Sequence, residues 1–265
     1  MAEVGRGCDP ETMDVMSMEL NELLRFWDSP GLGDNVESDK KYSKDLVDTL
    51  YKEYYLDNNR YGLIDVVLVI IDGSGRDMGT TYNLLNNVIV PNFQIDRILV
   101  AINQADMAMK GRNWDYEKNE PNGQLVDFLE DKVRSIKDRV YEATGVKIEP
   151  IYYCAGYKEG DRQEKPYNLS KLLYYIVKAT PSEKRAVYVD NINGDKQMWE
   201  DDDELIDYGK ETRNTIFNSI VEGATNGADI GETIGSVFGT VGGKIGRVAG
   251  GIIGGVVGFF GGLFG

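Results

Sequence analysis

This sequence contains no histidine, which excludes acid/base catalysis by an imidazole and metal binding through imidazole nitrogens. Its two cysteines, Cys8 and Cys154, are isolated, and they are too few for a disulfide framework or a zinc-ligand cluster. Residues 1–7 contain no apolar core of the kind found in signal peptides. These absences favour a protein of a reducing, cytoplasmic compartment.

Basic residues are also fewer than acidic residues. The chain has 29 lysines and arginines against 44 aspartates and glutamates, for a net charge of −15. No local basic patch interrupts this acidity, so we expect no surface that binds DNA. Only Asp229 and Glu232 among the acidic residues lie beyond residue 222. The length of 265 residues suits one large domain, or one domain with an appendage.

Apolar runs that alternate with helical spacing follow one another along the first two thirds of the chain. Such alternation predicts an α/β fold with an open, mostly parallel sheet and flanking helices. In these sheets ligands bind at the carboxyl ends of the strands. We expect strands over residues 15–20, 23–27, 64–71, 95–103 and 148–154, and helices over residues 40–56, 78–90, 124–144, 169–178 and 205–221. The polar pair Asn21-Glu22 predicts a hairpin turn between the first two strands, and Gly145 predicts the end of the third helix.

Residues with groups that could bind a ligand follow three of the predicted strands. Asp28 and Gly31 come after the strand over 23–27; the acid can hold the water shell of a magnesium ion, and the glycine amide can approach a terminal phosphate. Asp106, after the strand over 95–103, can accept two N–H bonds from the edge of a guanine. The small Ala155, after the strand over 148–154, lets a backbone amide meet the carbonyl oxygen of the base. Taken singly, each motif is also compatible with an ordinary strand–helix turn.

Together these motifs resemble the G domain of Era-like, translation-factor-class GTPases, particularly a bacterial group of 50S-ribosome-binding-type GTPases. Asp28-x-x-Gly31 is similar to the third G motif, Asn103-Gln104-Ala105-Asp106 to the fourth, and Cys154-Ala155-Gly156 to the fifth. The resemblance covers roughly residues 1–180. It implies binding of GTP or GDP with Mg²⁺, and it implies roles for these residues: Thr12 and Asp28 for magnesium, Gly31 for the γ-phosphate, and Asn103, Asp106 and Ala155 for guanine.

The sequence departs from this family in several places. The phosphate-binding loop, Gly-x-x-x-x-Gly-Lys-Ser/Thr, is absent, and the first strand and most of the first helix of the family fold are missing with it. That strand would lie between the strands over 23–27 and 64–71. We therefore expect a truncated product or a misassigned start, with Met1 an internal methionine of a longer parent. Gln104 stands where the family usually has lysine, and Leu32 where some GTPases have a water-orienting glutamine, so we expect GTP hydrolysis to be weak or lost.

Residues 181–222 form an acidic linker and helix, in which we expect the acidic run 200–204 to be a solvated linker or a helix start; its spacing does not fit a calcium-binding loop. From residue 223 glycine recurs every fourth position, at 223, 227, 231, 235, 239 and 243, and a second such series runs from 242 to 262. This pattern resembles glycine-zipper hairpins that insert into membranes. Residues 248–265 carry no charge over a length close to the shortest that spans a bilayer. The alternative is a soluble glycine-rich tail that is disordered or packs against a partner.

The predicted organisation is a GTPase-like domain (1–180), the acidic linker and helix (181–222), and a helical glycine-zipper tail (223–265). The leading prediction is a guanine-nucleotide-binding protein whose tail associates with a membrane or with other copies. It would be cytoplasmic, and peripheral to the inner membrane or inserted in it through the tail. Two alternatives stay open. One is a non-catalytic membrane-interaction protein in which the G domain is a scaffold, and the other is an inert fragment. The sequence predicts neither ribosome contact nor oligomeric state.

Overall fold

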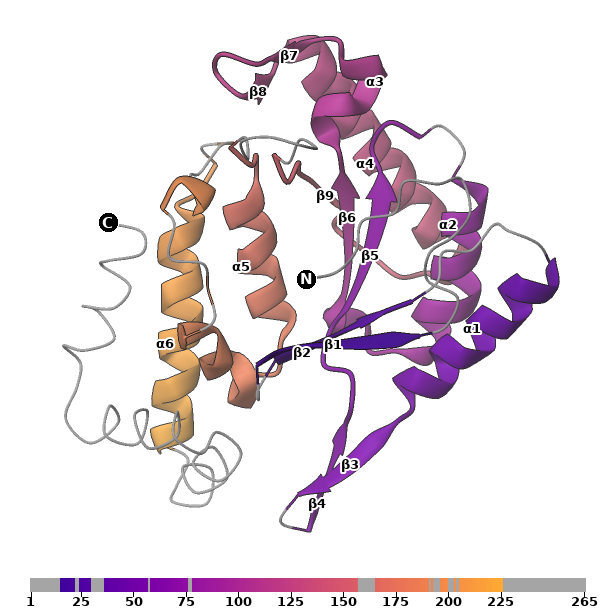
Figure 1. The fold of residues 1–265 in the computed structure, drawn as a ribbon, viewed down its shortest axis with the longest axis vertical. Helices are drawn as coiled ribbons and strands as arrows, with labels where there is room; N and C mark the ends of the chain where they lie inside the picture. The colour runs from indigo at the N-terminus through magenta and orange to yellow at the C-terminus, as the bar shows by residue number, and fades with distance from the viewer. Residues whose placement is uncertain are drawn as a thin grey trace.

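The structure is a computed structural model that describes residues 15–21, 24–29, 36–56, 58–75, 78–156, 165–190, 192, 196–199, 203 and 205–225 (Figure 1). Thr12, Gly31, Leu32 and all of the tail after residue 225 lie outside these residues. The described part is an α/β protein, in agreement with the predicted fold class.

A parallel sheet of three strands forms the centre of the molecule. Its strands stand in the order β5 (Val67–Asp72), β6 (Ile98–Asn103) and β9 (Ile151–Tyr152). The register between β5 and β6 runs without a break from Val67 opposite Ile98 to Asp72 opposite Asn103. The three predicted strands are thus confirmed, although each is shorter than expected. Residues 95–97, for example, form a 3-10 turn before β6 begins.

Helices cover both faces of this sheet (Figure 1). On one face lie α1 (Val36–Leu50), α2 (Gly79–Asn83) with its π-helical and 3-10 continuations (Leu84–Ile89 and Val90–Asn92), and α4 (Gly123–Thr144). On the other face lies α5 (Leu169–Ala179), with α6 (Tyr208–Thr225) packed against its outer side. Two 3-10 segments, Ser182–Asp190 and Lys196–Trp199, lie between α5 and α6 in the chain.

The apolar core has a large cluster on one face of the sheet and smaller ones on the other. The large cluster joins Val69 and Ile71 of β5 and Ile102 of β6 to the buried residues of α4 and of the π-helical segment Leu84–Ile89. On the opposite face Ala101 and Tyr153 contact Leu172 of α5. Burial of both faces explains the almost continuous apolar sequence of β6, because a parallel sheet is normally covered by helices on each side. One face of β5 is less covered, since Ile70 is exposed.

The ends of α4 follow from local chemistry. The side-chain oxygen of Asn122 accepts hydrogen bonds from the backbone N–H groups of Gln124 (3.1 Å) and Leu125 (3.3 Å), which would otherwise lack partners at the helix start. Gly145 ends the helix with a φ of +74°, in the left-handed region that glycine adopts without strain. The predicted helix and its stop are confirmed.

The helix expected over residues 40–56 is wrong in its last turn. α1 ends at Leu50, and β3 (Glu53–Leu56) then pairs with β4 (Asn59–Gly62) in an antiparallel hairpin that projects from the molecule (Figure 1). The rings of Tyr54 and Tyr61 stack across this hairpin with centroids 5.5 Å apart. Tyr54 lies at helical spacing from Leu50, but its cross-strand contact with Tyr61 stabilises the hairpin instead.

The first two strands form the predicted hairpin. β1 (Met16–Asn21) pairs with β2 (Leu24–Asp28) in antiparallel orientation. The expectation that β2 belongs to the open parallel sheet is not met within the described residues, where β2 pairs with β1 in a sheet separate from that of β5, β6 and β9. No described strand bridges the two sheets. Asp28 is therefore not at the carboxyl edge of the parallel sheet, although it does end its own strand.

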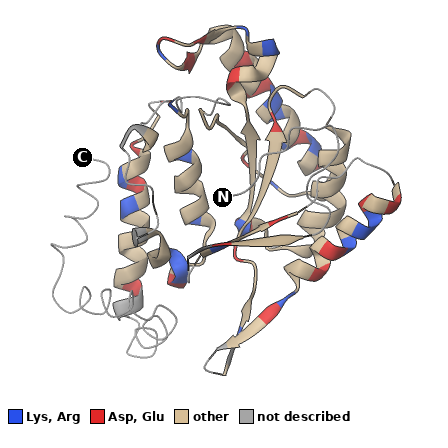
Figure 2. Ribbon diagram, in the orientation of Figure 1, with Lys and Arg blue, Asp and Glu red and all other residues tan. Residues whose placement is uncertain are grey.

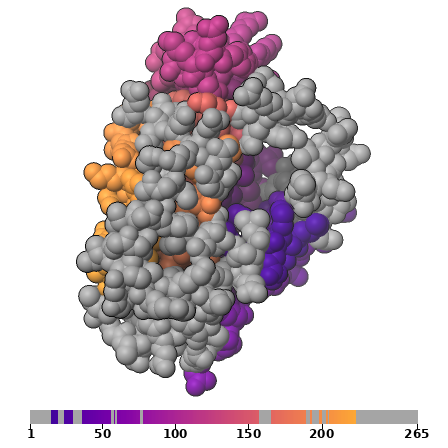
Figure 3. Space-filling model, turned by 60° about the vertical axis from the view of Figure 1, so that its left-hand side comes forward, coloured from indigo at the N-terminus to yellow at the C-terminus, as the bar shows by residue number. Residues whose placement is uncertain are grey.

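A protrusion above the sheet holds α3 (Ala108–Gly111), β7 (Trp114–Asp115) and β8 (Glu120–Pro121) (Figures 1 and 3). Trp114 anchors it, because this side chain is buried and meets the ring of Tyr167 edge-on at 5.3 Å between centroids. The side-chain amide of Asn119 donates to the carbonyl oxygens of Lys165 and Pro166 at 3.2 and 3.1 Å. The protrusion is thus tied to the segment that leads into α5.

Acidic and basic side chains alternate along the outer helices (Figure 2). Most ion pairs are exposed, such as Arg134–Asp131, and contribute little to stability. The pair of Lys184 and Asp65, with 2.6 Å between Nζ and Oδ1, is different: the lysine side chain is only 17% exposed and also lies over the rings of Tyr54 and Tyr61. Burial by itself would lower the pKa of Lys184, but the hydrogen bond and charge of Asp65 outweigh burial and raise it.

We predict that Asp65→Asn lowers the free energy of unfolding by about 1 kcal/mol, because it leaves a largely buried ammonium without its counter-charge. The control Asp131→Asn, at an exposed pair, should change the stability by less than about 0.5 kcal/mol. The raised pKa means that the pair stabilises the fold fully below the ordinary lysine pKa of about 10.4, and that this stabilisation is lost as the pH rises through the higher folded-state value. Urea unfolding at neutral and alkaline pH measures both effects. If Asp65→Asn and Asp131→Asn lower the free energy of unfolding equally, the prediction is contradicted.

Candidate functional site

The carboxyl ends of β5, β6 and β9 meet at one edge of the sheet because the strands are parallel. Hydrogen bonds join the loops that follow them. The N–H of Gly73 donates to the carbonyl oxygen of Asn103 at 2.7 Å, and the N–H of Ala105 donates to the carbonyl oxygen of Tyr153 at 3.1 Å. Three loops, over residues 72–75, 103–106 and 153–156, therefore lie side by side at the place where open α/β sheets bind ligands.

The middle loop turns sharply as it leaves β6. The side-chain oxygen of Asn103 accepts the N–H of Gln104 at 2.8 Å, and Gln104 has a φ of +57°, which is uncommon for a residue with a side chain. Ala105 is fully buried and starts a 3-10 turn, Ala105–Met107. The half-buried Asp106 thus lies within this single short turn after the strand end, while the side chain of Gln104 is exposed.

Backbone hydrogen bonds fix the start of the loop after β9, and the residue that follows is exposed. Cys154 and Tyr167 exchange two backbone hydrogen bonds of 3.1 and 3.0 Å, and both side chains are buried. Ala155 comes next and is exposed, and Gly156 has a φ of +66° that only glycine adopts freely. The chain can therefore present the backbone of Ala155 to a ligand beside the Asn103–Asp106 turn.

The loop after β5 was not predicted as part of a site. Its shape is set by Lys132 of α4, whose ammonium donates to the carbonyl oxygens of Asp72 (2.9 Å), Gly73 (2.9 Å) and Gly75 (2.8 Å). The carboxylate of Asp72 in turn accepts the N–H and the hydroxyl of Ser74. This network fixes the backbone of one of the three loops.

Lys132 carries a sequence signal that points to this role. The buried positions of α4 follow helical spacing, and Lys132 is the one charged residue among them: Leu125, Leu129, Lys132, Ile136 and Val140. A lysine on an apolar stripe must find buried partners for its ammonium. Burial lowers the pKa of Lys132, and the negative charge of Asp72 opposes this change.

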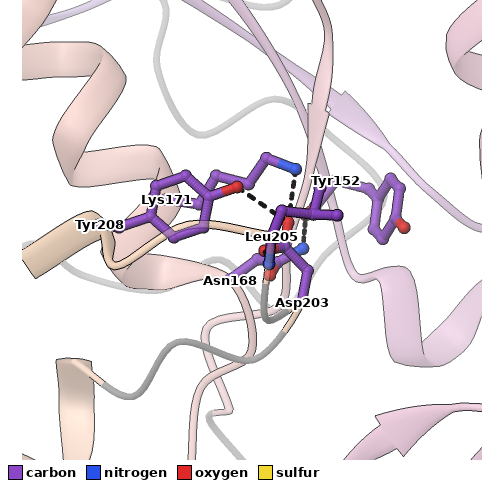
Figure 4. Close-up of polar contacts among 6 residues, drawn as sticks. All are labelled: Tyr152, Asn168, Lys171, Asp203, Leu205 and Tyr208. Atoms are coloured by element: carbon purple, nitrogen blue, oxygen red, sulfur yellow. Dashed lines mark hydrogen bonds and ion pairs between the residues drawn. The ribbon is translucent and has the colours of Figure 1, made fainter. Parts of the chain in front are cut away.

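A second unpredicted cluster lies beside β9 (Figure 4). The carboxylate of Asp203 accepts hydrogen bonds from Lys171 Nζ at 2.6 Å, from the hydroxyl of Tyr208 at 3.1 Å and from the backbone N–H of Leu205 at 3.2 Å. Its side chain is 9% exposed, so the expectation that the acidic run 200–204 is solvated is wrong for Asp203. The segment before α6 is thereby fixed to α5.

The Asp203 cluster lies close to the end of β9. The side-chain amide of Asn168 donates to the carbonyl oxygen of Tyr152 at 3.1 Å, which ties the start of α5 to that strand. Burial, and then the negative charges of Glu130 and Asp203, raise the pKa of Tyr152. Its phenol is therefore neutral at physiological pH, and it lies three residues before Ala155 in the chain.

The structure brings together three of the six predicted site residues. Asn103, Asp106 and Ala155 belong to adjacent, hydrogen-bonded loops at one edge of the sheet. Asp28 is exposed at the end of β2, in the separate hairpin, and Thr12 and Gly31 lie outside the described residues. Among the side chains that the structure describes, no group of three or more acidic or cysteine residues could hold a metal ion.

The fold and this edge define an α/β protein whose polar loops gather at the carboxyl ends of parallel strands. Comparisons of the chain with protein-family models, with curated proteins and with solved structures found no match. None of the helices in the described part of the chain combines the length and the apolar character needed to cross a lipid bilayer.

Proposed function

We propose that this chain binds a guanine nucleotide at the carboxyl edge of its parallel sheet. The hydrogen bond between Ala105 and Tyr153 carries the proposal, because it joins the turn that bears Asp106 to the loop that bears Ala155. A carboxylate at Asp106 can accept both the N1–H and the exocyclic N–H of guanine, and the backbone N–H of the exposed residue Ala155 can donate to the O6 atom. Charge-assisted hydrogen bonds of this kind are strong and discriminate well against other bases.

The phosphates would be held less firmly than the base. We propose that Asp28 and Thr12 bind Mg²⁺ and that Gly31 contacts the γ-phosphate, as the resemblance to Era-like GTPases implies. The chain lacks the loop whose amides and lysine cradle phosphates in that family, so nucleotide affinity should be modest and hydrolysis weak or lost.

We predict that Asp106→Asn changes the base specificity of the site from guanine to xanthine. The carboxamide of asparagine offers one acceptor and one donor, which no longer match the two donors of guanine but do match the N1–H and O2 of xanthine. GDP should bind at least about tenfold more weakly, because a ligand donor is left without an acceptor, and xanthosine diphosphate should bind more tightly than to the native chain. Titration calorimetry with Mg²⁺ measures both affinities.

The matched control is Asp96→Asn, which removes an exposed carboxylate before β6, at the opposite end of the sheet. It should leave both affinities unchanged. A folded native chain that does not bind GDP, or an Asp106→Asn variant that binds GDP as the native chain does, would contradict the proposed function.

We propose that the glycine-zipper tail, residues 223–265, associates with a membrane, and this proposal rests on the sequence. Its support is the double four-residue glycine repeat and the uncharged stretch from residue 248. We propose that the tail is coupled to the site through α6, whose last residues, 223–225, are the first of the tail. The segment before α6 is held to α5 by the ion pair of Asp203 with Lys171.

A further inference from the structure

The helix α6 is attached to the rest of the domain through a small interface. It packs on α5 and on the 3-10 segment Ser182–Asp190, on the side of α5 that faces away from the sheet (Figure 1). Among the described residues, the apolar cluster at this interface has four buried members: Val177, Ala186, Ile216 and Ile220. Because the hydrophobic contribution scales with the apolar area removed from water, this cluster stabilises the docked position of α6 only modestly.

Before its first turn, α6 is held by the buried carboxylate of Asp203. This carboxylate accepts hydrogen bonds from Lys171 of α5 at 2.6 Å and from the hydroxyl of Tyr208, the first residue of α6, at 3.1 Å (Figure 4). The ammonium of Lys171 also lies over the ring of Tyr208, 5.8 Å from its centroid. Asp203 therefore ties the start of α6 to α5. Removal of one partner from a pair this buried leaves the other charge uncompensated.

Near its end, α6 is held by Arg185. The guanidinium donates to the carbonyl oxygens of Lys178 (2.8 Å) and Thr180 (2.9 Å) at the end of α5, and to the hydroxyl of Ser219 of α6 at 3.1 Å. A cation at this position suits the negative end of the α5 dipole. The docking of α6 thus depends on polar contacts at both ends of a small apolar cluster.

One buried group opposes the docked position. Thr212 lies one turn before Ile216 on the same face of α6 and is 1% exposed. Its hydroxyl has no hydrogen-bond partner among the residues that the structure describes. A buried hydroxyl that has lost its hydrogen bonds to water destabilises the docked state, and movement of α6 away from α5 restores those bonds.

We propose that α6 opens from α5 as one unit while the sheet and the helices on it stay folded. The polar contacts specify the docked position, but the small apolar cluster and the buried hydroxyl keep its free energy close to that of the open position. Segments with few buried apolar contacts are the ones that open locally in native proteins. Opening carries residues 223–225, the start of the glycine-zipper tail, away from α5. Asp203 and Arg185 thereby regulate how closely the tail is held to the domain.

Amide hydrogen exchange of the full chain, measured by mass spectrometry without nucleotide, tests the proposal. After correction for intrinsic rates, the amides of α6 should exchange at least about tenfold faster than those of β6, because local opening exposes α6 alone. Ile102→Val weakens the core at β6, which stays intact when α6 opens. This variant should speed exchange in β6 by roughly two- to tenfold and leave exchange in α6 unchanged.

Two variants at the interface of α6 should act in opposite directions. Asp203→Asn leaves Lys171 without its counter-charge and should speed exchange in α6 at least about tenfold. Thr212→Val keeps the shape of the side chain without its hydroxyl, so exchange in α6 should slow at least about threefold. Asp138→Asn, at an exposed carboxylate of α4, is the control and should leave exchange in α6 unchanged.

Equal protection of α6 and β6, or an Ile102→Val variant that speeds both by the same factor, would overturn the proposal, because α6 would then open only when the whole domain unfolds. Exchange in α6 that is unchanged by Asp203→Asn would also overturn it, since the contacts of Asp203 would not hold the helix. Far-UV circular dichroism verifies that the variants are folded. The result is independent of nucleotide binding at Asp106, which plays no part in the measurement.

Discussion

Replacing Gly73 with alanine is expected to lower the free energy of unfolding by about 2–3 kcal/mol, as overpacking against rigid neighbours does. A Cβ atom at this position would lie 2.6 Å from the carbonyl oxygen of Asn103 and 2.9 Å from that of Gln104. Both atoms belong to the backbone and cannot rotate away. The ends of β5 and β6 must then separate, and the Gly73–Asn103 hydrogen bond of 2.7 Å would lengthen or break.

The matched control is Gly123→Ala. A Cβ atom at Gly123, the first residue of α4, meets nothing within 4 Å. Because alanine favours helix more than glycine does, this variant should be unchanged or more stable by up to about 1 kcal/mol. Urea unfolding followed by circular dichroism compares the two. If Gly73→Ala is as stable as Gly123→Ala, the close approach of the two strand ends is not required.

Loss of the ammonium of Lys132 should have a comparable effect. In Lys132→Met the stem of the side chain still fills the core, but three backbone carbonyl oxygens, those of Asp72, Gly73 and Gly75, lose a charged donor. Hydrogen bonds to charged groups contribute about 1.5–3 kcal/mol to stability. Removing the ammonium also removes the free-energy cost of burying its charge, so we expect the free energy of unfolding to fall by about 2 kcal/mol. The loop over residues 72–75 should become susceptible to proteolysis at the same time.

Lys137→Met is the appropriate comparison for this variant. Lys137 lies on the same helix, is 39% exposed and pairs with the exposed Glu149. Its replacement should change the stability by less than about 1 kcal/mol and leave the loop resistant. Equal stability of the two variants, with equal protease resistance of the loop, would show that Lys132 does not hold it.

Much of this protein follows from short-range sequence signals. Apolar runs predict β5 and β6, although only β6 is buried on both faces. Helical periodicity with a terminal glycine predicts α4 and its end at Gly145. The polar pair after β1 predicts the first hairpin. Asn103, Asp106 and Ala155 could be selected as neighbours because parallel strands necessarily bring their carboxyl ends to one edge. These features depend on residues close together in the chain.

The tertiary structure alone decided the features that depend on distant residues. The hairpin of β3 and β4 replaces the end of a predicted helix because Lys184, more than a hundred positions further along the chain, packs on Tyr54 and Tyr61. Asp203 is buried because Lys171 and Tyr208 meet it there. Among the described residues β2 pairs with β1 in a sheet separate from that of β5, an arrangement that the sequence of neither strand specifies. Local propensity cannot predict such contacts, since each is stabilised by partners that only the folded chain brings together.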